Sequence, residues 1–202
     1  MAVRQCRKKA TIAVRQQILQ AAGELFASEG YDRASMRRIA KAAGYSPTTI
    51  YLHFESKEGL LRSLCEETFA KLIHQFESIG RSAGDPVSKL RAVGRAYVEF
   101  GFTHPNHYTV TFTAGEPSKP EAQGNVRVSA GEKCFKFLQT MLAECVTSRK
   151  FREADLDVTS QALWAVMHGL TSLLIVRPDF AWRGRDNLVD GLLDTVSEGL
   201  RA

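Results

Sequence analysis

The groups in this sequence that could do chemistry gather in one run, between Ser46 and Lys57. The run reads SPTTIYLHFESK and brings together hydroxyl, phenol, imidazole and ammonium groups. Such groups donate hydrogen bonds to phosphate oxygens and to the edges of bases, and the methyl groups of threonine and leucine suit the methyl group of thymine. The chemistry that this run favours is the binding of a nucleic acid.

Two short helices must position these side chains. Ser35 is a helix N-cap residue ahead of a short apolar pattern that ends at Gly44, and Ser46 caps a second pattern. A helix-turn-helix needs a small residue at the helix crossing, a turn residue that tolerates positive φ, and an apolar plug from its second helix. Ala40, Gly44 and Ile50 occupy these places in order. The outer face of the second helix is then free to enter a major groove.

The rest of the chain is also predicted to be helical, because apolar residues recur at helical spacing and no alternation of period two persists. We predict an all-α fold of about nine helices, in which a three-helix DNA-binding domain precedes a helical ligand-binding and dimerisation domain. The expected organisation is a basic flexible arm over 1–10, a helix-turn-helix domain over 11–57 and an effector-binding and dimerisation domain over 58–202, with a connecting helix over 56–78.

The excess positive charge lies in the first third of the chain. Residues 1–60 contain 10 basic and 5 acidic side chains, and the remaining residues contain 17 of each. A segregated positive field favours a polyanionic partner, although an ordinary solvated surface is the alternative explanation.

The spacing of the cysteines and the hydropathy of the chain indicate in which cellular compartment the protein is expected. The four cysteines form no C-x-x-C pair, so reduced thiols in the cytoplasm are the simplest interpretation. The longest apolar run, 162–176, contains His168 and is too short and too polar to predict a bilayer crossing. We expect no membrane association, no metal and no cofactor. Cys6, on the basic arm, is a candidate oxidant sensor without an evident resolving partner.

The segment ILQAAGELFASEGYDRASMRRIAKAAGYSPTTIYLHFESKEGLL resembles the DNA-binding domain of the tetracycline-repressor (TetR) family. The resemblance covers about residues 12–65. Ser35 stands where the family usually has threonine, and Tyr45 where it usually has valine, a change that alters the packing or adds a groove contact.

The resemblance implies a homodimer whose second short helix faces double-stranded DNA. Together with the basic character of Arg37, it gives the predicted DNA-binding residues: Arg37, Ser46, Pro47, Thr48, Thr49, Tyr51, His53 and Lys57. A packing role for Tyr51 is the alternative to a DNA contact.

The C-terminal half resembles the Trp-His-Gly subgroup of such regulators through LWAVMHGL and HPNHYTVTF. This resemblance implies that the last two long helices pair with their copies in a four-helix bundle. The expected dimer-interface residues are Leu173, Leu188, Leu192 and Val196. An unknown, largely apolar effector is expected to contact Tyr97, Phe100, Tyr108, Phe112, Phe137, Trp164 and His168. A plain core role is the alternative for each of these aromatic residues.

The sequence lacks the motifs of common enzymes, including G-x-S-x-G, the P-loop and H-E-x-x-H. His104 and His107 form an H-x-x-H without an evident third metal ligand. We therefore predict a transcriptional regulator, acting as a repressor, that binds a near-palindromic operator as a dimer and is released by a small effector. The alternatives are an architectural DNA-binding protein without an effector and an all-α enzyme.

Overall fold

The computed structural model describes the backbone of residues 2–113 and 129–202, and side chains over 10–112 and 129–202. Within these residues the chain forms nine α-helices, and its only β-type pairing is an isolated bridge between Phe151 and Arg201. The predicted all-α class is confirmed. Residues 114–124, whose sequence AGEPSKPEAQG contains two prolines and two glycines and predicts a loop, lie outside the described residues. The chain divides into two compact units: residues 1–68 with 106–126, and residues 69–105 with 127–202.

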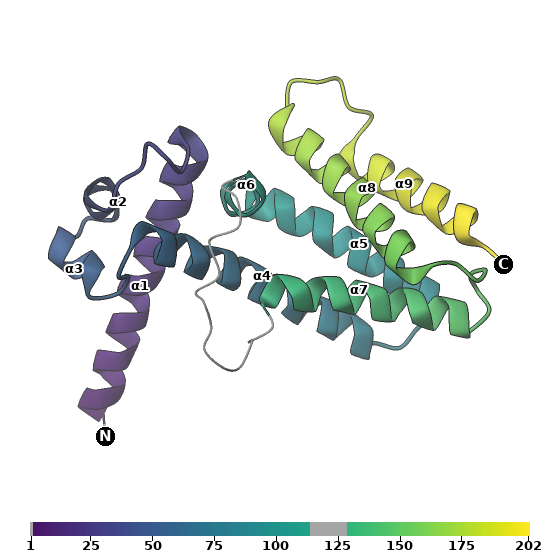
Figure 1. Ribbon diagram of the computed structural model, residues 1–202, viewed down its shortest axis with the longest axis horizontal. Helices are drawn as coiled ribbons and strands as arrows, with labels where there is room; N and C mark the ends of the chain where they lie inside the picture. The colour runs from purple at the N-terminus through teal and green to yellow at the C-terminus, as the bar shows by residue number, and fades with distance from the viewer. Residues whose placement is uncertain (1, 114–128) are drawn as a thin grey trace. The chain divides into compact units, whose positions relative to one another are not determined.

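The first unit is built around the two short helices that the sequence predicts (Figure 1). Its helices are α1 (Ala2–Glu29), α2 (Met36–Ala43), α3 (Pro47–Tyr51), the beginning of α4 (Lys57–Arg81) and most of α6 (Pro105–Thr113). Contacts of α2 with α1 and with α3 hold the short helices in place. This unit therefore positions the hydroxyl-rich run.

A continuous apolar core joins these helices. Its buried residues are Ile18, Leu19, Ala22, Phe26, Ala34, Met36, Ile39, Ala40, Ile50, Phe54, Leu60, Leu61, Leu64 and Val110. Val110 belongs to α6, which follows α5 in the chain, so the first unit includes a helix from beyond the predicted boundary at Lys57. The apolar pattern of a nine-residue helix does not reveal which core it joins.

Helix α1 differs from the expectation at its beginning. The helix begins at Ala2, whereas the sequence suggested a flexible arm over 1–10. Residues 2–10 contain no glycine or proline and are rich in alanine, arginine, glutamine and lysine, which favour a helix. The side chain of Cys6 lies outside the described residues, so its predicted redox role remains a prediction.

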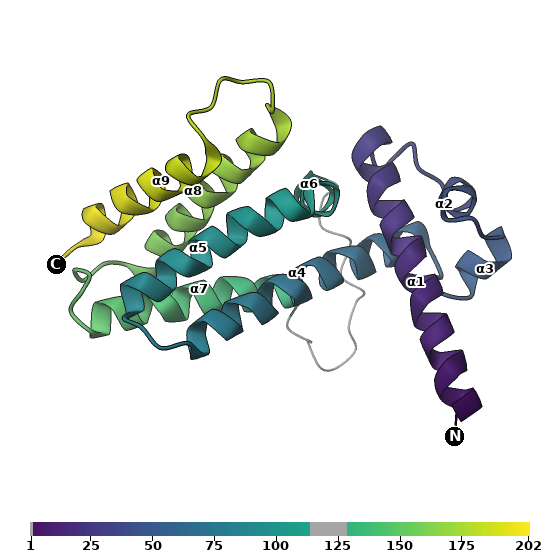
Figure 2. The same cartoon turned by 180° about the vertical axis from the view of Figure 1, so that it is seen from behind.

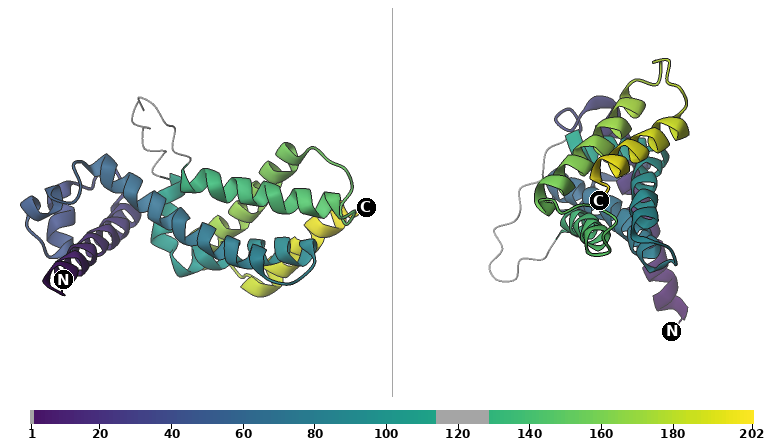
Figure 3. Two further views of the ribbon diagram at one scale, coloured as in Figure 1. Left: turned by 90° about the horizontal axis from the view of Figure 1, so that it is seen from below. Right: turned by 90° about the vertical axis from the view of Figure 1, so that its right-hand side faces the viewer.

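The second unit is a bundle with α5 (Pro86–Thr103) at its centre. Helix α5 contacts α7 (Ala130–Thr147), α8 (Leu156–Val176) and α9 (Arg185–Leu200), and Figures 2 and 3 show α8 and α9 side by side. The buried apolar residues include Leu90, Val93, Val98, Met141, Leu142, Leu163, Met167, Leu174, Val189 and Leu193. The later part of α4 packs on α7, where Phe76 and Phe137 place their ring centroids 5.9 Å apart.

Helix α9 approaches α5 closely because α5 carries a glycine at the contact. A Cβ atom on Gly94 would lie 2.8 Å from Cδ2 of Leu193, a distance that atoms do not tolerate. Charged pairs flank this contact: the guanidinium of Arg91 lies 2.7 Å from Asp194, and Arg95 pairs with Asp190. The seam between α5 and α9 thus has an apolar centre and charged edges.

Helix α8 is unusually apolar for the extent of its burial. By length and composition alone it could cross a membrane, with a mean hydropathy of 1.3 over its most apolar window, of which 28% is buried. The core helix of a soluble protein passes the same test. The exposed apolar side chains on α8 are Val158, Trp164, Val166, Leu173 and Val176.

The left-handed turn residue Gly44 provides a test of the first unit. Its φ of 76° strains any residue with a Cβ atom, so Gly44→Ala should lower the free energy of unfolding by about 1–2 kcal/mol. The control is Gly59→Ala, at a helical position of α4 where a Cβ atom meets only Ser56 Oγ at 3.4 Å. Urea denaturation should show a loss for the first variant only; equal effects would mean that the turn is not strained.

Candidate DNA-binding surface and effector region

The turn between α2 and α3 is fixed by caps on both helices. The Ser35 hydroxyl accepts a hydrogen bond from the backbone N–H of Arg38 at 3.3 Å, and Gly44 ends α2 in the left-handed conformation. The backbone N–H of Tyr45 then donates to the carbonyl of Ala40 at 2.9 Å. These local bonds bend the chain sharply, as the predicted helix-turn-helix requires.

Helix α3 has one buried side and one open side. Ile50 is 0% exposed and anchors the helix in the core. The Ser46 hydroxyl caps the helix by accepting from the backbone N–H of Thr49 at 3.1 Å, and it lies 2.9 Å from the Thr49 hydroxyl. The predicted contact residues Ser46, Pro47, Thr48 and Tyr51 are exposed, with Tyr51 55% exposed. Thr49 and His53 are half-buried, at the flanks of this face.

Tyr45 is the residue for which the sequence allowed two roles, a change in packing or a contact in the DNA groove. Its hydroxyl donates to Oε1 of Gln17 on α1, and its ring packs partly against the core of the first unit. The side chain therefore ties the turn to α1. Tyr45 therefore alters the packing of the turn, because a valine at this position has no hydroxyl group that could bind Gln17.

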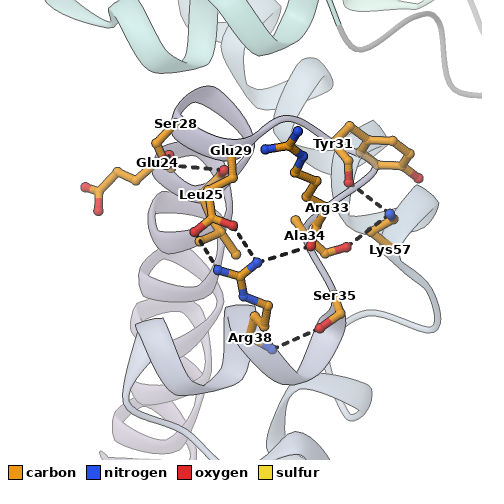
Figure 4. A network of polar contacts seen from close by, with 10 residues as sticks. All are labelled: Glu24, Leu25, Ser28, Glu29, Tyr31, Arg33, Ala34, Ser35, Arg38 and Lys57. Carbon is orange, nitrogen blue, oxygen red and sulfur yellow. Dashed lines mark hydrogen bonds and ion pairs between the residues drawn. The ribbon is translucent and has the colours of Figure 1, made fainter.

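The two arginines at the start of α2 have different surroundings. Arg38 donates to Glu29 at 2.6 Å and to the carbonyl of Arg33 at 3.3 Å, so its guanidinium braces the loop between α1 and α2 (Figure 4). The neighbouring Arg37, a predicted DNA-binding residue, is exposed. An exposed guanidinium suits a phosphate contact, whereas Arg38 has a structural role.

Lys57 has an internal role that the sequence did not predict. Its ammonium donates to the carbonyls of Tyr31 at 2.9 Å and Ala34 at 3.1 Å, and it lies 4.1 Å from the centroid of the Tyr31 ring (Figure 4). An ammonium has three donors, so these bonds leave one for a phosphate. The proposed DNA contact of Lys57 thus depends on a side chain that also ties α4 to the loop before α2.

Leu52 lies at the surface, as expected for a residue on the outer face of the second short helix. It follows α3 directly and is 80% exposed, the largest exposed fraction among the large apolar side chains of the described residues. Its spacing of four from Thr48, on the side opposite Ile50, is the sequence signal that predicts this position.

A polar group lies among apolar residues in the second unit. His168 of α8 is half-buried, with Nδ1 3.2 Å from the Tyr97 hydroxyl of α5 and Nε2 3.3 Å from the Ser172 hydroxyl. Both ring nitrogens have partners, and in a neutral imidazole one of them donates while the other accepts. Burial lowers the pKa of His168, which favours this neutral form.

The other predicted effector residues divide between the two units. In the second unit Tyr97 and Phe100 are buried, Phe137 is half-buried and Trp164 is 42% exposed. Trp164 lies between the ring of Phe135, at 6.1 Å between centroids, and that of His168, at 6.2 Å. Tyr108 and Phe112 belong to the first unit, where their ring centroids lie 4.8 Å apart. The structure thus joins Tyr97 directly to His168 by a hydrogen bond, and it places the Trp164 ring beside that of His168 at an interplanar angle of 48°.

The predicted dimer residues lie along α8 and α9. Leu173 is 50% exposed, whereas Leu188, Leu192 and Val196 are half-buried. Beside them Gly169, Gly191 and Gly199 face open space, since an added Cβ atom would meet nothing within 4 Å. These two helices offer small and apolar side chains that their own unit leaves partly uncovered.

The histidines and cysteines of the described residues are the groups that could bind a metal or react as thiols. No group of three potential ligands occurs there. His104 and His107 fall in different units, and burial, with a smaller contribution from Lys71, lowers the pKa of His104. Burial raises the pKa of Cys134 to about 12 and that of Cys145 to about 11, so both thiols stay protonated and unreactive.

Two family models match separate ranges of the chain. The model for "Bacterial regulatory proteins, tetR family" matches residues 18–64, and the model for "Tetracyclin repressor-like, C-terminal domain" matches residues 90–196. The first match contains the helix-turn-helix and every buried residue of its continuous apolar core except Val110. The second contains the Tyr97–His168 pair and most of α9.

Known proteins resemble the chain over most of its length or over part of it. The HTH-type transcriptional activator FasR of Mycolicibacterium smegmatis is 32% identical over 92% of this chain and 78% of its own. The fatty acid metabolism regulator protein of Bacillus subtilis is 38% identical over 38% of this chain and 40% of its own. The crystal structure of FadR from Bacillus subtilis in complex with stearoyl-CoA matches with a TM-score of 0.75 and 24% identity, covering 92% of this chain and 99% of that one.

The role of Lys57 can be tested by Lys57→Met. Losing the two charge-assisted hydrogen bonds should lower the free energy of unfolding by about 1.5–3 kcal/mol, measured by urea denaturation without DNA. The matched control is Lys71→Met, at an exposed position of the same helix, which should change stability by less than about 0.5 kcal/mol. Unchanged stability of Lys57→Met would leave phosphate binding as the main role of this ammonium.

The buried state of His168 predicts a pH dependence. Because its pKa is lowered from 6.5 on folding, the unfolded chain takes up the proton first, and stability present above pH 6.5 is lost as the pH falls. Thermal unfolding between pH 7.5 and 5 should show a smaller loss for His168→Gln than for the parent protein. His104, also shifted downward, should account for part of the remaining slope. Identical slopes would contradict the assignment.

Proposed function

The chain belongs to the TetR family of bacterial regulatory proteins and is a DNA-binding transcriptional regulator, and we propose that it acts as a homodimeric repressor released by a long-chain fatty acyl effector. The observation that carries the DNA-binding part is the open, hydroxyl-rich face of α3 beside the buried Ile50. In a dimer, two such faces enter successive major grooves of a near-palindromic operator. This action takes place in the cytoplasm, where the DNA lies.

The exposed apolar surface of α8 supports the dimer. Val158, Val166, Leu173 and Val176 are each at least 40% exposed, and a continuous apolar surface of this kind marks an interface. A second copy that packs α8 and α9 against their counterparts, as a four-helix bundle, covers these side chains together with Leu188, Leu192 and Val196. The glycines that face open space allow the helices of the two copies to approach closely.

The nature of the effector is inferred from the relatives and from the second unit. One relative is named for fatty acid metabolism, and one protein of the same fold was solved with stearoyl-CoA. In this chain, the neighbouring rings of Trp164 and Phe135 suit an acyl chain, and Tyr97 with His168 can hydrogen-bond a carbonyl oxygen. The Trp-His-Gly subgroup remains a hypothesis that agrees with this placement of Trp164 and His168.

Helix α6 is the proposed route by which the effector changes DNA binding. The chain passes from α5, which carries Tyr97, directly into α6, whose Val110 is buried in the core of the first unit. His107 of α6 also packs where a side chain on Gly23 would be, 2.8 Å from an added Cβ atom. A shift of α5 on effector binding is therefore passed to α1. Release requires that the effector bind the DNA-free state more tightly.

Fluorescence anisotropy tests this proposal. The protein should bind duplexes from upstream of its own gene about 10³-fold more tightly than scrambled duplex at physiological salt, with two chains per site. Tyr51→Ala should lose this preference and keep its helical content, because the side chain is exposed. Adding stearoyl-CoA, but not free coenzyme A, should release the duplex.

The other outcomes separate the parts of the proposal. Equal binding to all duplexes would favour an architectural protein and contradict the regulator mechanism. Specific binding without release would contradict the acyl effector alone. A promoter reporter whose expression falls when the gene is deleted would show activation in place of repression.

A further inference from the structure

The outward ridge of the recognition helix is formed by Thr48 and Leu52. An α-helix has 3.6 residues per turn, so positions two before and two after the buried Ile50 point away from the core. The backbone N–H of Leu52 donates to the carbonyl of Thr48 at 3.2 Å, which keeps the helical geometry through Leu52. The two side chains therefore stand next to each other on the face that the proposed function directs into the major groove.

This ridge lacks the side chains that usually distinguish bases by paired hydrogen bonds. Residues 47–52 read PTTIYL and include no arginine, lysine, asparagine, glutamine or acidic residue. Arginine and lysine recognise guanine, and asparagine and glutamine recognise adenine, through two bonds each. The helix offers only hydroxyl groups and apolar surface. The feature of the major groove that apolar surface recognises is the C5-methyl group of thymine.

The setting of Leu52 favours DNA as its partner. The side chain is 80% exposed, and the flanking helix α2 presents the exposed basic residues Arg37 and Lys41. Basic groups beside an apolar ridge attract phosphates and bring the ridge onto base edges.

We propose that Leu52, with the methyl group of Thr48, reads the C5-methyl group of a thymine in each half-site. Leu52 is then a specificity-determining residue, and the operator carries thymine at the base pair that it meets. This inference rests on the proposed binding of an operator.

The test replaces thymine by uracil. An operator is first selected from a pool of random duplexes with the full-length protein, and each thymine is then replaced in turn by deoxyuridine, which lacks the methyl group and keeps every hydrogen-bonding group. Removing one buried methyl contact should weaken binding about four-fold per half-site, at one position of each half-site.

Two variants assign the effect to Leu52. Leu52→Ala should bind the thymine and uracil duplexes equally, whereas Leu52→Met, which keeps the apolar contact, should still prefer thymine. Thermal unfolding of both variants should match that of the parent protein, because the side chain is exposed. The substitution of the DNA needs no variant, so the test stands even if one of them fails to fold.

Each outcome decides something different. A selected operator on which uracil has no effect at any position would overturn the role of Leu52 and leave the regulator intact. Retained thymine preference in Leu52→Ala would also overturn it. Failure to select any preferred duplex would contradict the proposed function itself.

Discussion

The burial of Ile50 is the constraint on which the DNA-binding surface depends. Its side chain is held among α1, α2 and α4, and it fixes the rotation of α3 about its own axis. Once that rotation is set, the helical period leaves Thr48 and Leu52 on the opposite side and Tyr51 beside them. Gly44 makes this possible, because its left-handed conformation turns the chain sharply enough for α3 to reach the core.

Several polar groups that a sequence would assign to DNA instead hold the first unit together. Arg38 braces the loop between α1 and α2, and Lys57 ties that loop to α4. A charged group that donates two or three internal hydrogen bonds costs free energy to withdraw, so it serves DNA only with the donors that remain. The charged groups and the uncharged face of α3 therefore have different roles. In the proposed complex, basic groups at the edge position the domain, and the uncharged ridge of α3 meets the bases.

The second unit combines a weakly polar interior with an incompletely covered surface. His168 hydrogen-bonds the hydroxyl groups of Tyr97 and Ser172, so an incoming carbonyl has to replace bonds that already exist. On α8, meanwhile, apolar side chains remain exposed at a density that is unfavourable for an isolated chain. Both features agree with a unit whose function lies in binding a second copy and an apolar molecule.

The sequence by itself determined the all-α class, the caps of α2 and α3, and the helix-turn-helix with Ile50 as its plug. These features follow from local rules: capping residues, a turn glycine and helical periodicity act over a few residues and are legible in the chain. It also predicted the match to the TetR family. The effector and dimer residues remain predictions.

The tertiary structure decided what distant residues do to one another. It placed Val110 of α6 in the first unit, turned the Tyr45 hydroxyl toward Gln17 and engaged Lys57 with two carbonyls. None of these follows from periodicity, because a side chain that is apolar or charged has the same local signature whether its partner is the core, a carbonyl or DNA. Which partner it meets depends on contacts between segments far apart in the sequence, and those are set only when the core packs.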